Sequence, residues 1–324
     1  MRAVVLTGTT LSARSDYPTP TPRDGEVLVR VLTAGVCETD LQLVRGYMGF
    51  SGVLGHEFVG VAESGPFQGR RVVGEINCSC WMCPTCTAGR PSHCPNRTVL
   101  GILKHDGAFA DCIAVPQRNL HLVPDALPTD VAVFTEPVAA AFQIPAQLDI
   151  RRDDHVVVLG DGRLGNLCAQ VLARLSDHVT VVGKHPEKLA LLSSPPKGAP
   201  DIRTMHLAAV EPDHAADVVV DCTGSPTGLP TALSLVRPRG TVVLKTTVAG
   251  EQTMAWAPVV IDEVTIVGSR CGPFDRALAA LDAGEVQVLP LISARYGLAA
   301  GLAAIEHART KSSLKVLIDV ESVA

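Results

Sequence analysis

A glycine-rich turn between an apolar run and a helical segment is the feature that most restricts the fold of this chain. The apolar run at 155–159 leads into Gly160-Asp161-Gly162-Arg163-Leu164-Gly165, and a helical pattern follows at 167–175. In such a turn the glycines allow a sharp bend, close approach of a pyrophosphate, and tight helix packing. A tight turn without a ligand is the alternative. The strand before it and the helix after it favour a dinucleotide at Gly160, Gly162, Arg163, Leu164 and Gly165.

Further apolar runs indicate how this segment extends into a domain. They lie at 179–182, 217–221, 241–244 and 264–267. Because they are apolar throughout rather than alternating, they are typical of parallel strands covered by helices on both faces. We therefore expect a doubly wound parallel sheet over residues 139–272.

The two ends of the chain have a different pattern. Short β-branched runs at 3–6, 26–34 and 57–63, separated by Pro and Gly, predict a mostly β domain over residues 1–138. Helical stretches at 276–283 and 299–308 and a last strand at 315–320 do not continue the rhythm of the middle. We therefore assign residues 273–324 to the first domain, which the middle domain interrupts.

Composition narrows the class of function. The chain has 324 residues, 47% of them hydrophobic, which is enough for two domains that each have a core. A net charge of -5 without a long basic run gives no electrostatic reason to expect nucleic acid or a membrane surface as partner. No apolar run is long enough for a membrane-spanning helix. Small-molecule chemistry in the cytoplasm is the expectation.

The end of the second apolar run bears on cofactor choice. An NAD-specific site usually places Asp or Glu there, against the ribose diol, whereas this chain has Gly183-Lys184-His185. The missing carboxylate would not repel a 2′-phosphate, and a cation could pair with it. The sequence thus favours NADP slightly over NAD. In the alternative interpretation Lys184 is only a solvated turn residue and either cofactor is accepted.

Four closely spaced cysteines predict a zinc site in a loop over residues 78–95. Their spacing and the surrounding Pro and Gly residues suit a tetrahedral thiolate site, which is closed to substrate and therefore structural. Cys78 and His93 are additional donors nearby, and unligated thiols are the alternative. The four proposed ligands are Cys80, Cys83, Cys86 and Cys94.

A second metal set is scattered along the sequence. Cys37, His56 and Glu136 offer a thiolate, an imidazole and a carboxylate, a plausible three-ligand set that leaves one zinc position open for water or substrate. Taken singly, each residue has an ordinary structural explanation. Only the fold could bring them together.

The chain resembles the zinc-containing medium-chain dehydrogenase/reductase family, of the alcohol, sorbitol and threonine dehydrogenase type. This resemblance implies a GroES-like β-barrel catalytic domain interrupted by a Rossmann domain, with the active site between them. The motifs that carry it cover nearly the whole chain and are Gly35-Val36-Cys37-Glu38-Thr39-Asp40, Gly55-His56-Glu57, the lobe from Cys80 to Cys94, Thr135-Glu136-Pro137, the Gly160 to Gly165 loop and Asp221-Cys222-Thr223-Gly224.

The resemblance also implies roles for individual residues. Cys37 and His56 become catalytic zinc ligands, and the third is Glu136 or Glu57, since similar enzymes differ at this point. Asp40 would orient the zinc-bound histidine, and Thr39 would relay the substrate proton. Gln42 departs from the family, because the histidine that often ends this relay is absent. Thr223 and Lys315 fall where similar enzymes contact the cofactor, although Lys315 could equally be a solvated residue at a strand start.

The sequence as a whole predicts a zinc-dependent oxidoreductase with two Zn²⁺ per chain. It would transfer a hydride between an alcohol or polyol, or the corresponding carbonyl, and NADP or NAD. The resemblance implies a homodimer or homotetramer. Two alternatives are a zinc-free reductase of activated double bonds and a non-catalytic nucleotide-binding regulator in which zinc is only structural.

Overall fold

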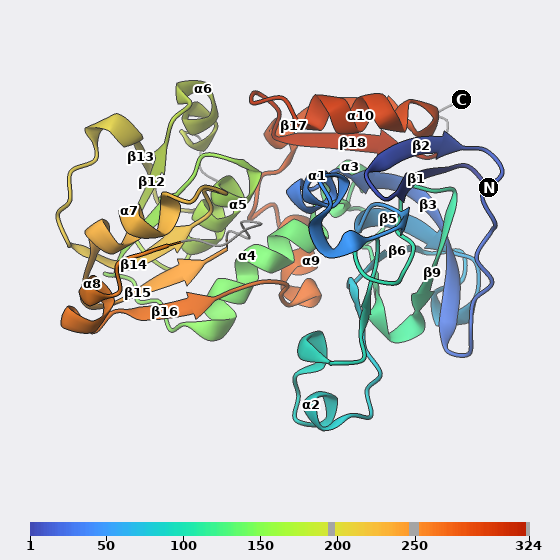
Figure 1. Cartoon of the computed structure of the whole chain (residues 1–324), viewed down its shortest axis with the longest axis horizontal. Coiled ribbons are helices and arrows are strands. Elements are labelled where there is room, and N and C mark those ends of the chain that lie inside the picture. Colours follow the sequence, from blue (N-terminus) through green and yellow to red (C-terminus); the bar gives the residue numbers. More distant parts are fainter. Residues whose placement is uncertain (194–197, 246–252, 322–324) are drawn as a thin grey trace. The chain divides into compact units, whose positions relative to one another are not determined.

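The computed structural model describes residues 1–193, 198–245 and 253–321, and its contacts divide the chain into two units. Unit 1 comprises Met1–Glu136 and Leu291–Ala324, and unit 2 comprises Pro137–Pro290. The middle of the chain thus forms a unit of its own, inserted into the sequence of the other (Figure 1).

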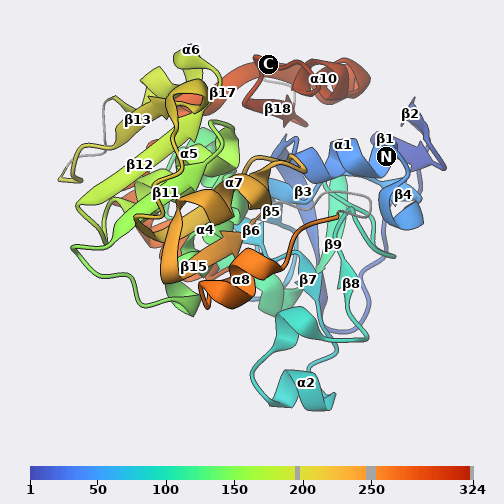
Figure 2. The same cartoon turned by 60° about the vertical axis from the view of Figure 1, so that its left-hand side comes forward.

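Unit 2 is built on a parallel six-stranded sheet of order β13-β12-β11-β14-β15-β16. This is the strand order of a Rossmann domain, and it confirms the expected doubly wound sheet. Strands β11, β12 and β13 lie side by side in Figure 2. The elements are α4 (Thr135–Gln147), β11 (His155–Leu159), α5 (Arg163–Leu172), β12 (His178–Gly183), α6 (Pro186–Leu189), β13 (Arg203–His206), β14 (Ala216–Asp221), α7 (Gly228–Leu235), β15 (Val236–Leu244), α8 (Ala257–Ile261), β16 (Thr265–Gly268) and α9 (Phe274–Asp282).

The central strands of unit 2 are buried on both faces, which explains why their sequences are apolar throughout. In β11, Val156, Val158 and Leu159 are at most 1% exposed, although Leu159 points to the opposite face from Val158. Strand β13 was not expected from the sequence. It lies at the sheet edge and consists of exposed or half-buried Arg-Thr-Met-His, so it has no apolar run to reveal it.

Unit 1 is mostly antiparallel β structure. One sheet has the order β10-β6-β5-β3-β18-β17, with β9 also paired to β3, and another has the order β2-β1-β4. The elements are β1 (Ala3–Thr7), β2 (Thr10–Arg14), β3 (Glu26–Gly35), α1 (Glu38–Val44), β4 (Gly52–Val53), β5 (Glu57–Ala62), β6 (Arg71–Gly74), β7 (Asn77–Cys78), α2 (Pro84–Thr87), β8 (Thr98–Val99), β9 (Cys112–Pro116), β10 (Leu120–Leu122), α3 (Thr129–Ala132), β17 (Ile292–Gly297), α10 (Gly301–Ala308) and β18 (Lys315–Asp319).

The return to unit 1 occurs later than the sequence suggested. The sequence pattern assigns residues 273–290 to the first domain, whereas the structure places them in unit 2. Gln170 of α5 explains this, because its side chain donates to Gln287 O (2.9 Å) and accepts from Gln287 N (2.7 Å). Helix α9 also buries Phe274 and Leu281. Only Leu291 and the residues after it rejoin unit 1.

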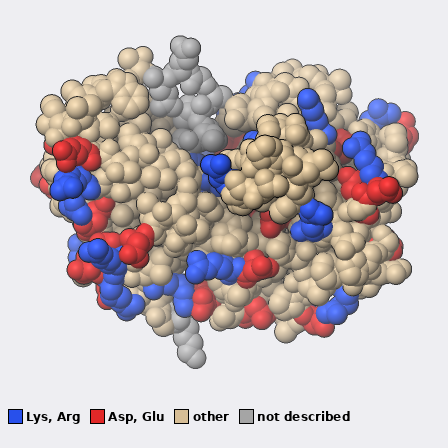
Figure 3. All heavy atoms as spheres, turned by 90° about the horizontal axis from the view of Figure 1, so that it is seen from below, with Lys and Arg blue, Asp and Glu red and all other residues tan. Residues whose placement is uncertain are grey.

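None of the helices in the described part of the chain has both the length and the hydrophobicity needed to cross a bilayer. On the face drawn in Figure 3, Lys and Arg side chains are interspersed with Asp and Glu, and neither sign dominates the residues shown.

Candidate metal and dinucleotide sites

Asp40 joins two loops of unit 1 at the predicted catalytic site. Its carboxylate is fully buried and accepts hydrogen bonds from Cys37 N (2.8 Å) and Gly55 N (3.2 Å). The bond from Cys37 is part of a capping box at the start of α1, which fixes where the Cys37 side chain leaves the backbone. Nδ1 of His56 lies 3.4 Å from Asp40 Oδ1. Asp40 therefore sits beside His56, as its predicted orienting role requires.

Cys37, His56 and Glu57 form a cluster suited to a metal ion. One ligand atom from each lies within 4.8 Å of the other two, and His56 and Glu57 are buried. Oε1 of Glu57 is buried and has no hydrogen-bond partner among the described residues. A buried carboxylate oxygen without a partner is rare, and a bound cation would satisfy it. The donor set of sulfur, nitrogen and oxygen fits zinc.

The cluster is strongly anionic. Burial alone would lower the pKa of His56, but the negative charges of Asp40 and Cys37 outweigh it and hold that pKa well above its ordinary value. Surroundings that stabilise a proton on this imidazole also attract a divalent cation in its place.

Lys315 lies in the same buried region. It is the first residue of β18, is fully buried, and pairs with Glu57 Oε2. Burial lowers the pKa of Lys315 to about 8, opposed by the negative charges of Cys37 and Asp40. The structure therefore excludes the alternative of a solvated lysine. Its predicted contact with a cofactor pyrophosphate stays a prediction.

Of the remaining residues considered for this site, Thr39 lies next to the cluster, whereas Glu136 is not part of it. Thr39 Oγ1 lies 3.8 Å from Cys37 Sγ, so the proposed relay hydroxyl is next to the cluster. Glu136 is the second residue of α4 and does not belong to the set of mutually close ligand atoms. The amide of Gln42 donates to Glu38 Oε1 (2.7 Å), so both ends of that bond lie on α1.

The four cysteines of the lobe converge on one point. Sγ of Cys94 lies 3.4 Å from that of Cys80 and 3.8 Å from that of Cys83, and Cys83 and Cys86 are 3.5 Å apart. A tetrahedron with Zn–S bonds of about 2.3 Å has edges of ~3.8 Å. Backbone N–H groups of Met82 and Cys83 lower the pKa of Cys80 to about 6 and favour its thiolate. The lobe, which carries α2, extends away from the sheet of unit 1 in Figures 1 and 2.

The glycine loop of unit 2 has the geometry expected of a phosphate-binding turn. Gly160 has φ +113°, and a Cβ there would lie 2.7 Å from Cys222 O, so only glycine fits. Helix α5 begins directly after Gly162. Thr223 follows β14 beside this loop, because its N lies 3.2 Å from where that Cβ would be. The first strand, the loop and Thr223 thus lie together at the carboxyl edge of the sheet.

The carboxylate of Asp161, for which the sequence pattern suggested no role of its own, lies at the end of β12. Asp161, inside the glycine loop, accepts hydrogen bonds from Lys184 N (2.6 Å) and His185 N (2.7 Å), and the His185 ring is 3.1 Å away. Burial alone would raise the pKa of Asp161, but these hydrogen bonds outweigh it and lower the pKa. Gly183 allows this approach, since its Cβ would lie 2.5 Å from Asp161 Oδ2. Asp161 is the second residue of the Gly160 to Gly165 loop, so a carboxylate near the cofactor site was visible in the sequence.

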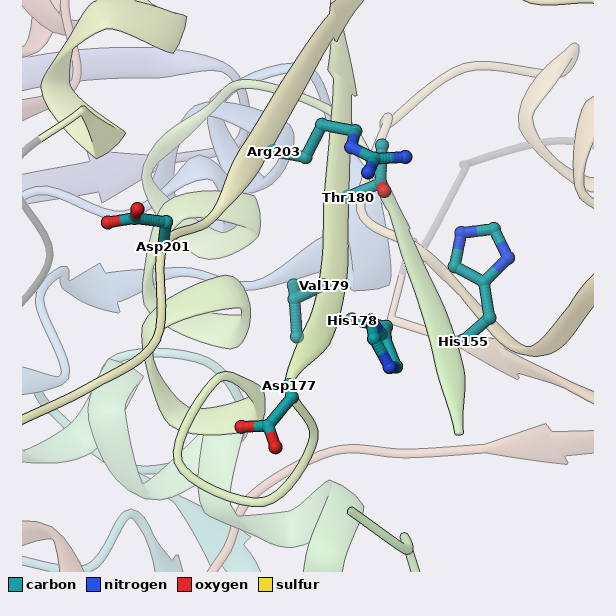
Figure 4. Close-up of a pocket in the computed structure, with 7 residues that line it drawn as sticks. All are labelled: His155, Asp177, His178, Val179, Thr180, Asp201 and Arg203. Carbon is teal, nitrogen blue, oxygen red and sulfur yellow. The ribbon is translucent and has the colours of Figure 1, made fainter. Parts of the chain in front are cut away.

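A separate hollow of about 240 Å³ lies at the amino-terminal ends of strands β11 and β12 (Figure 4). His155 and His178, which are register partners, begin β11 and β12 there. Dinucleotides bind at the carboxyl ends of such strands, so this hollow is not part of that site. Its lining residues are His155, Asp177, His178, Val179, Thr180, Asp201 and Arg203.

Comparison with known proteins gives matches to two family models. Residues 23–125 match the alcohol dehydrogenase GroES-like domain, and residues 164–283 match the zinc-binding dehydrogenase domain. A sorbitol dehydrogenase from Halalkalibacterium halodurans is 28% identical and covers 98% of this chain and 99% of its own length.

Solved structures give similar matches over nearly the full length of the chain. A zinc-binding dehydrogenase from Sinorhizobium meliloti, bound to NADP, has a TM-score of 0.86 at 26% identity, covering 98% of this chain and 99% of its own. An alcohol dehydrogenase from Escherichia coli, complexed with NADH, has a TM-score of 0.87 at 25% identity and covers 99% of each chain.

Gly35 gives a test of the buried pair. A Cβ at this position would lie 2.6 Å from Glu57 Oε2 and 2.9 Å from Lys315 Nζ. We expect Gly35→Ala to displace the pair and to lower the free energy of unfolding by about 1–3 kcal/mol, measured by urea unfolding. The control is Gly297→Ala, where a Cβ meets nothing within 4 Å. Equal effects of the two substitutions would contradict this account of the pair.

Proposed function

Because this chain belongs to the zinc-type medium-chain dehydrogenase/reductase family, and is therefore an oxidoreductase, we propose that it transfers a hydride between an alcohol or polyol, or the corresponding carbonyl, and NADP or NAD. The observation that carries this proposal is the cluster of Cys37, His56 and Glu57, in which Cys37 is half-buried and the other two are buried. A closed structural site or a nucleotide-binding scaffold would not need a second cluster with three different donor types.

Charge balance supports zinc at this cluster. The Cys37 thiolate, Asp40 and Glu57 would contribute three negative charges, and Lys315 contributes one positive charge. A divalent cation would bring the total to zero, which matters because unbalanced buried charge is costly. We propose that Glu57 is the third protein ligand through Oε1, while its Oε2 remains with Lys315.

The residues around this cluster would then each have a role in the reaction. Zinc when bound supplies a Lewis acid for the substrate oxygen, and the nicotinamide accepts or gives the hydride. Asp40 holds the His56 ring in place, as partners of zinc-bound histidines usually do. The Thr39 hydroxyl passes the substrate proton onward. An amide cannot titrate near neutral pH, so Gln42 does not end this relay, and the proton leaves through water or the cofactor ribose.

The third ligand bears on the substrate class. A carboxylate is a harder ligand than the cysteine found in many alcohol dehydrogenases, and we take it to favour polyols and sugar-like substrates over simple alcohols. The sorbitol dehydrogenase relative supports the same choice. The ten cysteines form no disulfide bond in the described structure, which fits a reducing compartment, and we propose the cytoplasm.

For the cofactor we propose a preference for NADP. Gly183 places no side chain at the end of β12, and Lys184 is exposed there. Asp161 brings a negative charge close by, but its carboxylate already accepts from Lys184 N and His185 N. We expect this carboxylate to stay with those donors, which leaves the Lys184 ammonium available to a 2′-phosphate.

Metal content separates the proposal from its alternatives. Protein purified without chelator should contain about two zinc per chain, one at the lobe and one at the cluster. Cys94→Ser should lose the lobe zinc and lower the thermal midpoint, and Cys37→Ser should lose the other zinc together with activity. Elemental analysis measures both. One zinc in the wild type would instead favour a zinc-free reductase or a regulator.

The same measurement distinguishes the two glutamates. Glu57→Asp keeps the charge that Lys315 needs but shortens the carboxylate, so it should weaken zinc binding at the cluster about tenfold or more. Glu136→Gln is the matched control and should retain zinc. If Glu136→Gln loses zinc and Glu57→Asp keeps it, Glu136 is the third ligand.

Lys184 provides the test of cofactor preference. Lys184→Ala should lower kcat/KM with NADP about tenfold, the loss of one charge-assisted hydrogen bond, and leave kcat/KM with NAD nearly unchanged. Lys311→Ala, an exposed lysine of unit 1, is the control. A wild-type enzyme that strongly prefers NAD would overturn the proposed preference.

We further propose that the protein is a homodimer through unit 2. Among the described strands β16 is a sheet edge, and in the segment that precedes it Trp256, Val260 and Ile261 are 62%, 73% and 77% exposed. An unpaired edge flanked by exposed apolar side chains is typical of an interface. Ile261→Asp should shift the mass measured by sedimentation velocity toward the monomer, whereas Leu302→Asp in unit 1 should not. A monomeric wild type would refute the proposal.

A further inference from the structure

Lys245 is a buried cation for which the mechanism above has no use. It follows β15 directly and is 9% exposed. Its Nζ donates to Ala140 O (2.6 Å) and to Ser269 Oγ (3.3 Å), both neutral acceptors. Among the residues that the structure describes, no carboxylate pairs with it. This differs from Lys315, whose charge is matched by Glu57.

A charge in this position is costly to keep. Lys245 directly follows the apolar run 241–244, in which Val242 and Val243 are at most 1% exposed. Two neutral oxygens compensate an ammonium less well than a carboxylate does. They also leave one of its three protons without a partner among the described residues. A neutral residue would fit this environment more easily, so the charge itself needs an explanation.

The field of Lys245 reaches the floor of the glycine loop. The hydrogen bond from Cys222 is the main cause that lowers the pKa of Cys168, and the positive charge of Lys245 adds to it against the effect of burial. Cys222 lies directly beneath the loop, because its carbonyl oxygen is 2.7 Å from where a Cβ on Gly160 would be. The cation therefore acts on the region where the dinucleotide is expected.

The strand order of the sheet indicates which half of the dinucleotide would lie closest to Lys245. In this fold the acidic or basic residues after the second strand contact the adenosine ribose, so β11, β12 and β13 hold the adenosine half. The nicotinamide half then belongs to β14, β15 and β16, across the point where the strand order reverses. Lys245 follows β15, and its partner Ser269 follows β16.

We propose that Lys245 sets the charge preference of the nicotinamide pocket, favouring the neutral reduced ring over the positively charged oxidised ring. The reason is electrostatic, because two like charges in a poorly solvated site repel each other and a neutral ring avoids that cost. Binding the reduced form more tightly raises the reduction potential of the bound cofactor. For a two-electron couple, a tenfold ratio of affinities corresponds to about 30 mV. This inference rests on the proposed use of a nicotinamide dinucleotide.

The experiment compares affinities rather than rates. Zinc-loaded protein is titrated with NADP⁺ and with NADPH by calorimetry, and the ratio of the two dissociation constants is taken for each variant. Lys245→Met removes the charge at similar volume and should lower the ratio of the NADP⁺ constant to the NADPH constant about tenfold. A tenfold change is the size expected if the unit charge of Lys245 acts on the nicotinamide ring across roughly 12 Å at an effective dielectric constant of about 20.

Two controls separate charge from structure. Lys245→Arg keeps the charge, and Ser269→Ala removes one neutral hydrogen bond to Nζ, so both should keep the wild-type ratio within about twofold. Lys245→Gln is the second neutral variant and should behave like Lys245→Met, which keeps the test valid if the methionine variant does not fold.

The outcomes are distinct. If the neutral variants weaken the binding of NADP⁺ and of NADPH equally, Lys245 only supports the fold, and the inference is wrong. If the ratio changes as much in Lys245→Arg as in Lys245→Met, the charge is not the cause, and the inference is again wrong. If the wild type binds neither NADP(H) nor NAD(H), the proposed function itself fails, and that result is recognisable before any variant is made.

Discussion

The buried carboxylate of Asp40 is the interaction on which the candidate catalytic site depends. It caps the first turn of α1 through Cys37 N, holds the 55–57 segment through Gly55 N, and faces the His56 ring. The segments that supply the thiolate and the imidazole are 15 residues apart along the chain, as measured from Asp40 to Gly55. Because both oxygens of one rigid side chain are used, the two ligands are placed before any metal binds, and this lowers the cost of binding it.

Charge balance differs between the two units. In unit 1, Glu57 and Lys315 compensate each other inside the core, and the surplus of negative charge beside them would be matched by a divalent ion. In unit 2, Lys245 is held by neutral oxygens. The first arrangement suits a resident cation, and the second suits a ligand whose charge changes during the reaction. Buried charge thus marks both places where we expect chemistry.

The sequence predicted the sheet of unit 2 well because its central strands are buried on both faces. A strand with helices on either side must be apolar throughout, and that pattern is visible without a structure. It could not predict β13, which lies at the sheet edge and whose side chains are polar except for Met205. It also placed residues 273–290 in the wrong domain, since the amphipathic pattern of α9 shows that one face of the helix is buried but does not identify what it packs against.

The sequence by itself determined the features that lie within short stretches of chain. The spacing of Cys80, Cys83, Cys86 and Cys94 and the glycines of the 160–165 loop fix local backbone geometry, so their arrangement follows from a few neighbouring residues. Only the tertiary structure showed that Glu57 lies close to Cys37 and His56, that Lys315 is buried against Glu57, and that Asp161 reaches the end of β12. Glu57 and Lys315 are 258 residues apart, and a contact over that distance depends on how strands β3, β5 and β18 pair rather than on any local pattern.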